Sequence, residues 1–315
     1  MAERPPVAYY QFCILCAKKE ELRELMEVLD QRFKSARTDD DDVADQVYFV
    51  PSRDGKVRKL LVTTCAGMGH VNAAVRTAQL LSKHAPAVMI FLGTAASMKP
   101  KKIQIGDVVI PRKAVNRAYD KISQKGQADY ADRAEQGNFQ EFFYNDNALV
   151  ADLDTIEVSA GAQAIIARAP IREAKLERGT ATEMELGGGK IVFRNPSVFD
   201  DVDIVSCGMV VDSTSYRDFL AGMASEHMRK ADVIDMESFG FFQAIRATRD
   251  LASGHGTHGL MIRGISDYAG RKEQSEARPE GWKEKAIRNA AIVAADLFES
   301  LTARYWTPPE AEAAE

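Results

Sequence analysis

The sequence predicts a single-domain α/β fold with a central mixed, mostly parallel β-sheet flanked by helices. Two observations favour this class. Apolar runs typical of buried strands alternate along the chain with segments whose apolar residues recur at helical spacing. The chain has 315 residues, of which 45% are hydrophobic, and that is enough to bury one large core. We expect this domain to span residues 7–302.

The N-terminal half begins with an apolar run, residues 7–17, which is expected to be a strand buried on both faces. A helix follows it, with apolar residues at helical spacing at Leu22, Leu25, Met26, Leu29 and Phe33. Residues 38–46 are rich in aspartate and indicate a solvated acidic loop. Further strands are expected from residue 56 into the glycines at 67 and 69, then at 87–97 and 105–115. Between the first two, residues 71–84 predict a helix whose buried stripe is Val71, Val75, Ala78 and Leu81.

The pattern weakens around residues 116–200, where polar, glycine-rich pieces alternate with short helical segments. We expect an insertion here and not a second domain. Regular elements return with apolar runs at 203–211, 232–250 and 259–267. A closing helix is predicted over 282–301, with an apolar face of Ile287, Ala291, Ala294, Phe298 and Leu301. Residues 303–315 are expected to form a disordered tail.

Composition excludes several classes of function. The formal net charge is -5, and no Lys/Arg cluster is long enough to predict a nucleic-acid partner. No apolar run reaches the roughly 20 residues of a membrane span, and the N-terminus lacks the features of a secretory signal. We therefore expect a cytoplasmic protein without a membrane partner. Cys13 and Cys16 form a C-x-x-C, but they lie in an apolar run without other ligands at metal spacing. They are expected to be reduced core residues, and neither a metal nor a cofactor is predicted.

Carboxylates follow three separate predicted strands, at Glu21, Glu237 and Asp267. Because ligands bind outside the carboxyl ends of strands in open α/β sheets, this pattern indicates a shared cleft with acid chemistry. Each residue also has a plainer interpretation. Glu21 fits the first turn of a helix, Glu237 fits a helix surface and Asp267 fits a loop cap. The glycines at 67 and 69 form only a G-x-G, so a dinucleotide or P-loop site is not indicated.

Five motifs resemble the nucleoside phosphorylase/nucleosidase superfamily in order and approximate spacing. They are "CAKKEELREL", "AGMGHVNAA", "LGTAASMKPKKIQIGDVVI", "VIDMESFGFF" and "IRGISDYA". The chain is most similar to the branch typified by methylthioadenosine/S-adenosylhomocysteine nucleosidases. The "RGISDYA" ending and "VNRAYDKI" also resemble nucleosidase-like domains of immune-type NTPase proteins. The resemblance implies a nucleoside phosphorylase-like fold, no cofactor, and a homodimer or larger homo-oligomer.

The resemblance also implies a role for each matching residue. Glu21 corresponds to the glutamate that activates water, Glu237 to the one that holds the ribose hydroxyls, and Asp267 to the acid that protonates purine N7. Arg263 corresponds to an arginine that anchors the cleft. The remaining substrate-binding positions are Met68, Thr94, Ala95, Val210, Val211, Asp235, Met236 and Ser266. The sequence departs from the family in two places: Ala96 and Ser97 replace a usual Gly-Gly, and "CGMVV" lacks the aromatic that stacks on the base.

We therefore expect hydrolysis of a purine, adenine-type nucleoside such as methylthioadenosine or S-adenosylhomocysteine. Phosphorolysis is a weaker alternative, because Glu21 stands where phosphate would bind, and a non-catalytic nucleoside sensor is the weakest. The group at the ribose 5′ position stays open among thioether, hydroxyl and phosphate, so an AMP or ATP nucleosidase is also an alternative. Four cationic side chains lie near the motifs and are candidate phosphate contacts or ordinary surface charges: Lys18, Lys19, His70 and Lys99.

Overall fold

The structure is a computed structural model, and it describes most of the predicted domain. The described residues are 10–36, 45–51, 55–116, 155–186, 189–208, 210–211, 217, 231–251, 256–270 and 281–301. The predicted tail at 303–315 and the first part of the predicted insertion, 117–154, lie outside them.

The centre of the sheet is built from parallel strands. β1 (Phe12–Cys16) lies between β4 (Val57–Thr64) and β5 (Val88–Ser97) and runs parallel to both. β14 (His258–Asp267) also pairs with β5 in parallel. All five residues of β1 are buried, as expected for a strand covered on both faces. These strands correspond to the apolar runs that the sequence assigns to buried strands.

Antiparallel pairs join the rest of the sheet to this centre. β13 (Ala231–Asp235) pairs antiparallel with the end of β5, and β12 (Asp203–Ser206) and β7 (Lys113–Asn116) follow in parallel. The outer and short strands are β8 (Thr155–Glu157), β2 (Lys34–Ser35), β3 (Asp45–Pro51), β6 (Val108–Val109) and β11 (Val198–Phe199). The predicted α/β fold with a mixed sheet is confirmed.

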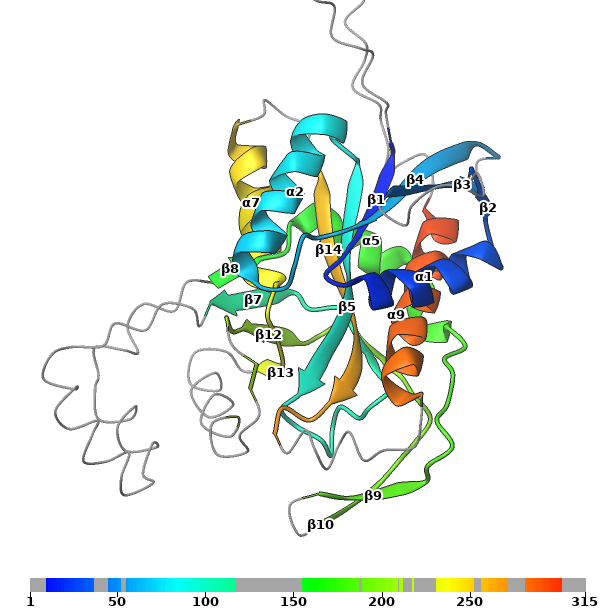
Figure 1. Ribbon diagram of the computed structural model, residues 1–315, viewed down its shortest axis with the longest axis vertical. Helices are drawn as coiled ribbons and strands as arrows, with labels where there is room; N and C mark the ends of the chain where they lie inside the picture. Colours follow the sequence, from blue (N-terminus) through cyan, green and yellow to red (C-terminus); the bar gives the residue numbers. More distant parts are fainter. Residues whose placement is uncertain are drawn as a thin grey trace, which may run out of the picture.

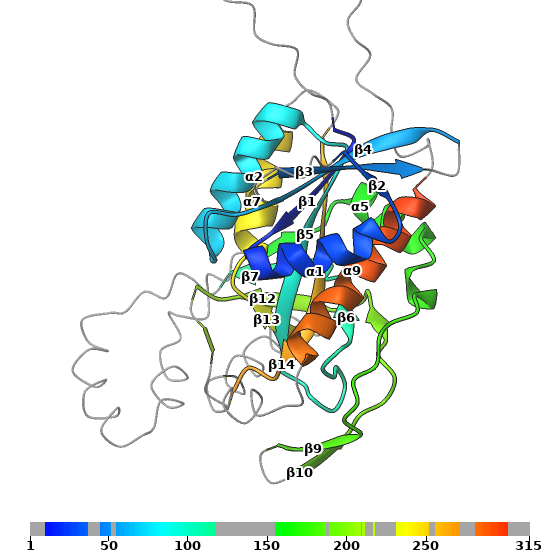
Figure 2. The same ribbon diagram turned by 45° about the vertical axis from the view of Figure 1, so that its right-hand side comes forward.

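Helices cover both faces of this sheet (Figure 1). α1 (Lys19–Asp30) packs beside α9 (Trp282–Ser300), whereas α2 (His70–His84) packs beside α7 (Ser238–Leu251) on the other side (Figure 2). The helix predicted over 282–301 is α9, and its predicted apolar face is buried.

Three of the four residues predicted for the buried face of α2 are exposed, and only Leu81 is buried as predicted. Val71 and Val75 are 75% and 52% exposed, and Ala78 is also exposed. The buried residues of this helix are instead Ala73, Thr77, Leu80, Leu81 and His84. The physical reason is that α2 lies against α7, where Gly240 closely approaches the backbone of His70. This close contact at the first turn of α2 is accompanied by burial of the face that carries Ala73 and Thr77, and the valines lie outside it.

Two other local expectations differ from the structure. The acidic segment at 38–46 gives way to strand at Asp45, where β3 begins. The single strand expected over 105–115 is two short strands, β6 and β7.

Cys13 and Cys16 are buried and unpaired, and their burial raises the pKa of both thiols well above the usual value. Inert core thiols are what the apolar setting of this C-x-x-C predicts.

Residues 155–173, which lie in the stretch where we expect an insertion, pack onto the rest of the molecule. β8 pairs with β7, and α5 (Ala160–Arg168) buries Ile165 and Ile166 in the common core. A short 3₁₀ turn, η2 (Ile171–Glu173), follows. Beyond it, β9 (Glu183–Leu186) and β10 (Gly189–Val192) form a separate hairpin that projects from the sheet (Figure 1).

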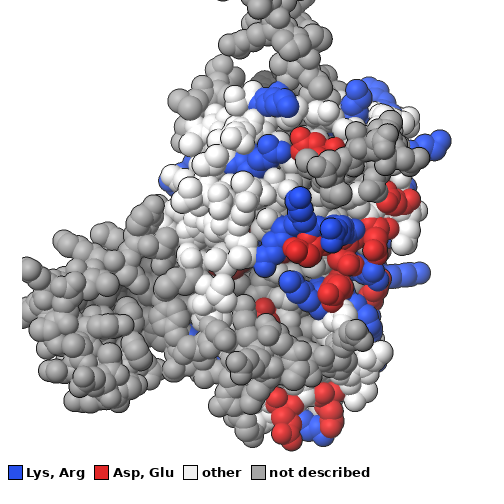
Figure 3. All heavy atoms as spheres, viewed as in Figure 1, with Lys and Arg blue, Asp and Glu red and all other residues white. Residues whose placement is uncertain are grey.

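Charged side chains are unevenly spread over the face shown in Figure 3. Lys, Arg, Asp and Glu are intermixed near α1 and α9, for example in the pair of Arg288 with Glu24. The area over α2 carries few charges, in keeping with the exposure of Val71 and Val75. In the part of the chain that the structure describes, no helix combines the length and apolarity needed to cross a bilayer.

Candidate active site

A cleft opens where β1, β13 and β14 end, beside the last part of β5. All of the predicted site residues line it except Arg263, which is buried directly behind its wall. The lining residues are Ala17, Lys18, Glu21, Met68, Thr94, Ala95, Ala96, Val210, Val211, Ile234, Asp235, Met236, Glu237, Ser266 and Asp267. Segments far apart in the sequence therefore meet at one place, as the strand-end pattern predicts.

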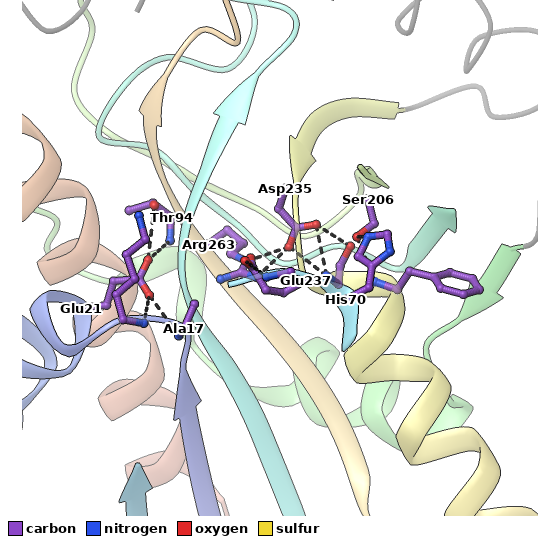
Figure 4. Close-up of polar contacts among 12 residues, drawn as sticks. Ala17, Glu21, His70, Thr94, Ser206, Asp235, Glu237 and Arg263 are labelled. Carbon is purple, nitrogen blue, oxygen red and sulfur yellow. Dashed lines mark hydrogen bonds and ion pairs between the residues drawn. The ribbon is translucent and has the colours of Figure 1, made fainter. Parts of the chain in front are cut away.

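Glu21 is held by the backbone at the junction of β1 and α1. Its Oε2 accepts hydrogen bonds from the backbone N–H groups of Ala17 and Lys18, both at 3.1 Å. Its Oε1 accepts from the backbone N–H of Thr94 at 3.1 Å (Figure 4). The residue is only 2% exposed. The carboxylate thus accepts from the backbone at the start of its own helix, as the plainer interpretation of Glu21 predicts. It is also fixed against β5 and lines the cleft, so this interpretation does not exclude a role in the site.

Arg263 lies between Glu21 on one side and two further carboxylates on the other (Figure 4). Its Nη2 donates to Asp235 Oδ2 at 2.7 Å and to Glu237 Oε2 at 3.1 Å, and its Nε donates to the same Asp235 oxygen at 3.2 Å. Its guanidinium also stacks over Phe91, with Cζ 4.8 Å from the ring centroid. The side chain is completely buried, so its charge depends on these neighbours for compensation.

The carboxylate of Asp235 is engaged by protein groups. Besides Arg263, it accepts from the backbone N–H of Ser238 at 3.1 and 3.2 Å and from the Ser238 hydroxyl at 2.7 Å. Ser238 is the first residue of α7, so Asp235 also satisfies an otherwise unpaired N–H at the start of that helix. Asp235 lines the cleft, yet its main contacts anchor Arg263 and α7.

Glu237 is turned toward the cleft and is 5% exposed. Its Oε1 accepts from the backbone N–H of Gly69 at 3.1 Å. Gly69 has a φ of 93°, a conformation that favours glycine, and directly precedes α2. Burial raises the pKa of Glu237 from 4.5 to about 6; Arg263 opposes this rise, whereas Asp235 adds to it. A carboxylate that titrates near neutrality is a common property of active sites.

The space beside Gly93 is bordered by both Glu21 and Arg263. A Cβ on Gly93 would lie 2.4 Å from Arg263 Nη1 and 2.8 Å from Glu21 Oε1. Among the described residues, this Nη1 has no hydrogen-bond partner although it is buried. A buried cationic N–H without an acceptor is costly, so this nitrogen is suited to hold a small polar ligand next to Glu21.

A strand irregularity shapes the opposite end of the cleft. β14 shifts register against β5 between Ile265 and Asp267, so that Asp267 pairs with Ala96. Side chains of consecutive residues normally point to opposite faces of a strand. Here Ser266 and Asp267 both line the cleft, and the Ser266 hydroxyl donates to Asp267 Oδ2 at 3.0 Å. The backbone N–H of Ala269 donates to Asp267 Oδ1 at 3.0 Å, which fixes the carboxyl group further.

The other candidate cations differ in their placement. His70 turns to Ser206, with Nε2 and Oγ 2.7 Å apart, and Lys99 Nζ lies 2.6 Å from Asp232 Oδ1. Burial lowers the pKa of His70, while Asp235 partly opposes this shift. Lys19 is exposed, whereas Lys18 lines the cleft. Across the described residues, no group of His, Cys, Asp and Glu side chains is arranged to hold a metal ion.

Comparison with known proteins gives one family match and one partial relative. Residues 11–299 match the family described as the Phosphorylase superfamily. A stretch of 73 residues is 41% identical to a 5′-methylthioadenosine/S-adenosylhomocysteine nucleosidase of Marinomonas sp. (strain MWYL1). This stretch is 23% of the present chain, and it spans only 30% of the length of that relative.

Solved structures resemble the chain over most of its length. A 5′-methylthioadenosine/S-adenosylhomocysteine nucleosidase from Neisseria meningitidis, in complex with methylthio-immucillin-A, superposes with a TM-score of 0.56 at 19% identity, covering 92% of this chain and 99% of that one. Futalosine hydrolase of Helicobacter pylori gives 0.56 at 15% identity, with 91% and 97% covered. The H. pylori nucleosidase bound to butyl-thio-DADMe-Immucillin-A gives 0.58 at 15% identity, with 92% and 98% covered. At these identities the likeness concerns the fold.

Proposed function

Because this chain belongs to the phosphorylase superfamily, we propose that it hydrolyses the N-glycosidic bond of a purine, adenine-type nucleoside and releases the free base. The observation that carries the proposal is the meeting of Glu21, Glu237 and Asp267 in one cleft, with an N–H of Arg263 beside Glu21 that has no acceptor among the described residues. Cleavage of this bond turns the sugar into an oxocarbenium-like cation. It therefore needs an activated water, negative charge near the sugar, and an acid at the leaving base.

Glu21 and Arg263 fit the water-activating role. A water placed between these two side chains would accept a hydrogen bond from Arg263 Nη1, which has no acceptor among the described residues, and donate one to Glu21 Oε1. Glu21 is then the general base: its carboxylate takes one proton from the water as the oxygen attacks C1′ of the ribose. Its backbone donors from Ala17, Lys18 and Thr94 hold the carboxylate in this orientation.

Glu237 and Asp267 serve the other two needs. Glu237 accepts hydrogen bonds from the ribose hydroxyls and places negative charge next to the developing cation. Asp267, in its protonated form, donates its proton to N7 of the purine as the C1′–N9 bond breaks and its electron pair moves to the base. Ser266 and Ala269 orient this carboxyl group through their hydrogen bonds. The other predicted substrate-binding residues are assigned to ribose and base contacts, with Arg263 as an anchor behind them.

Phosphorolysis is the weaker candidate on this geometry. A phosphate would need the backbone N–H groups of Ala17, Lys18 and Thr94 as donors, but the carboxylate of Glu21 already accepts from all three. A second anion at this point would also be repelled by Glu21. A non-catalytic sensor has no need of three carboxylates in separate roles, so hydrolysis agrees best with the site.

The names of the relatives support an adenine-type substrate, since the partial sequence relative and two of the solved neighbours above are called methylthioadenosine/S-adenosylhomocysteine nucleosidases. The test is a base-release assay on the purified protein with adenosine, inosine, methylthioadenosine, S-adenosylhomocysteine, AMP and ATP. Adenine release that is independent of added phosphate supports hydrolysis. Release that requires phosphate and yields a ribose 1-phosphate would establish the alternative, and tight binding without any release would establish a sensor.

A homodimeric or larger assembly in the cytoplasm is part of the same proposal. Val71 and Val75 form an exposed apolar stripe on α2, and Met68, which is 42% exposed, links this stripe to the cleft. A contiguous apolar surface next to a functional site is typical of an interaction face, whereas isolated exposed valines are not. We assign this stripe to contact with a second copy of the chain.

A further inference from the structure

We infer that Lys18 selects substrates that carry a negatively charged group on the ribose 5′ substituent. This inference deepens the proposed function and rests on it. It concerns the part of the substrate that Glu21, Glu237 and Asp267 do not contact in the proposed reaction.

Lys18 lies at the cleft, and its ammonium group has no ion-pair partner among the described residues. It lines the same wall as Glu21, whose Oε2 accepts from its backbone N–H at 3.1 Å. It is the one cationic side chain lining the cleft in the part of the chain that the structure describes. Within that same part, its ammonium group forms no ion pair of 4.0 Å or less. Lys99, in contrast, pairs with the fully buried Asp232, which also contacts Lys102.

The position of Lys18 in its helix makes this charge unusual. Lys18 is the N-cap residue of α1, and its side chain makes no capping hydrogen bond. N-caps favour Ser, Thr, Asp and Asn, whose oxygens accept from the first N–H groups, and an ammonium group has no acceptor. The positive end of the helix dipole also repels a cation at this point. The helix itself therefore gives no reason for a lysine here.

The chemistry of the cleft also needs a counter-ion for Lys18. The sugar becomes positively charged during cleavage, and a nearby ammonium group opposes that change unless an anion compensates it. Four acidic side chains line the cleft, at Glu21, Asp235, Glu237 and Asp267, and Arg263 pairs with only two of them, Asp235 and Glu237. An anionic substrate would be repelled by this set, so it would bind well only where its charge reaches a cation. An anionic substrate group beside Lys18 would offset the lysine's charge near the sugar cation, and Lys18 would offset the repulsion of that group by the acidic side chains.

The chemistry of a purine nucleoside restricts where this anion can lie. Adenine is neutral near pH 7, and the ribose 2′ and 3′ hydroxyls are assigned to Glu237. Only the 5′ substituent can carry a negative charge without disturbing either contact. Two sources share this chemistry: a phosphate on the 5′ oxygen, and a carboxylate at the end of a 5′ thioether chain. Methylthioadenosine has neither and is the natural neutral reference.

The experiment measures kcat/KM for adenine release from AMP, S-adenosylhomocysteine and methylthioadenosine with the full-length protein. Lys18→Met should lower kcat/KM by about 10- to 100-fold for at least one of the two substrates with a negatively charged 5′ group, as loss of a charge-assisted contact predicts, and by less than about threefold for methylthioadenosine. Lys18→Arg should retain most of the activity on that substrate. Lys19→Met is the matched control, because it removes the same charge from the adjacent exposed residue and should change nothing.

The outcomes separate the two proposals. A loss confined to AMP identifies phosphate as the anion, and a loss confined to S-adenosylhomocysteine identifies the carboxylate. Equal losses on all three substrates, or no loss on either anion, would overturn the role of Lys18. Cleavage of methylthioadenosine alone would also overturn it while leaving the proposed hydrolysis intact. If the wild-type protein released adenine from none of the three, the proposed function itself would be wrong.

Discussion

Arg263 and Asp235 form an ion pair that is closed to solvent: Nη2 lies 2.7 Å from Oδ2, and the side chains are 0% and 1% exposed. Such a pair contributes little net stability relative to apolar residues, but removing one partner leaves a buried charge uncompensated. In this cleft the pair fixes the guanidinium that also reaches Glu237 and borders Glu21. Its main contribution is therefore to position the groups on either side.

Asp235→Asn should lower the free energy of unfolding by ~3 kcal/mol, the low end for a broken buried pair, because Glu237 stays beside Arg263. Asparagine still caps a helix, so the start of α7 is retained. Urea unfolding followed by circular dichroism measures the change. Glu183→Gln is the control, because it removes one partner of an exposed pair with Lys190 and should change stability by less than about 0.5 kcal/mol. Equal effects of the two substitutions would contradict the assigned role of the buried pair.

Asp267→Asn should reduce adenine release by roughly 10²–10⁴-fold, the usual cost of losing a general acid. The fold should be unaffected, because asparagine can still accept from the Ala269 N–H through its carbonyl and donate to the Ser266 hydroxyl through its amide. Steady-state kinetics and the melting temperature test both statements. Turnover close to wild type in the folded variant would remove Asp267 from the reaction.

Glu21→Gln should abolish hydrolysis while still allowing the nucleoside to bind. The purine and ribose contacts remain, but the amide cannot take a proton from water. The NH₂ group of the glutamine would replace an oxygen that accepts from backbone N–H groups, so donors would face each other. We therefore also expect the free energy of unfolding to fall by about 1–3 kcal/mol. Calorimetric titration with a nucleoside gives the affinity, and Glu20→Gln at the neighbouring exposed position is the control. Loss of binding together with turnover would make Glu21 a binding or structural residue.

The pH dependence should show an acidic limb in kcat/KM near pH 6, the pKa of buried Glu237. Activity should fall below this pH, because protonated Glu237 no longer supports the sugar cation. The contribution of Glu237 to the free energy of unfolding should change in the opposite direction, decreasing as the pH rises. The pKa in the folded state is above the ordinary 4.5, so the stability contribution of this group is fully present below about 4.5 and is lost as the pH rises through about 6. A kinetic limb that Glu237→Gln leaves in place would assign the titration to another group.

Val75→Glu should convert an assembly into monomers by placing a buried charge in the proposed contact. Light scattering coupled to size-exclusion chromatography gives the mass directly. Val57→Glu is the matched control, since Val57 is 63% exposed on β4, away from the α2 stripe. A wild-type protein that is monomeric at micromolar concentration would contradict the proposed assembly.

The sequence predicts the fold well where a single periodicity dominates. Long apolar runs such as β1 and β14 and the closing helix α9 are placed correctly, because burial on both faces or along a stripe leaves a clear pattern. The predicted face of α2 is mostly wrong because its valines have the right spacing for a core stripe. The close contact of Gly240 with the backbone of His70 goes with burial of a different face of the helix. Such contacts depend on a partner helix that lies far away in the sequence.

At the site, the sequence predicts which residues meet but not how they are held. Their positions after predicted strands and within the motifs predict Glu21, Glu237 and Asp267 as site residues. The capture of Glu21 by three backbone N–H groups requires the relative placement of β1 and β5, which no local pattern contains. The register shift that brings both Ser266 and Asp267 into the cleft is likewise a property of paired strands. Ala17, Ala96 and Ile234 line the cleft beside predicted residues, and their adjacency to strand ends was the available signal.

Gly93 affects how inactive relatives of this protein would be recognised from their sequences. A Cβ added at this position would lie 2.4 Å from Arg263 Nη1 and 2.8 Å from Glu21 Oε1, so any side chain here would clash with both. A single base change converts any glycine codon to an alanine codon. A gene with that change would still encode every acid and the arginine of the cleft, yet its product would have those groups forced apart. A survey that scores only ionisable residues would count this gene as intact, so position 93 belongs among the diagnostic sites.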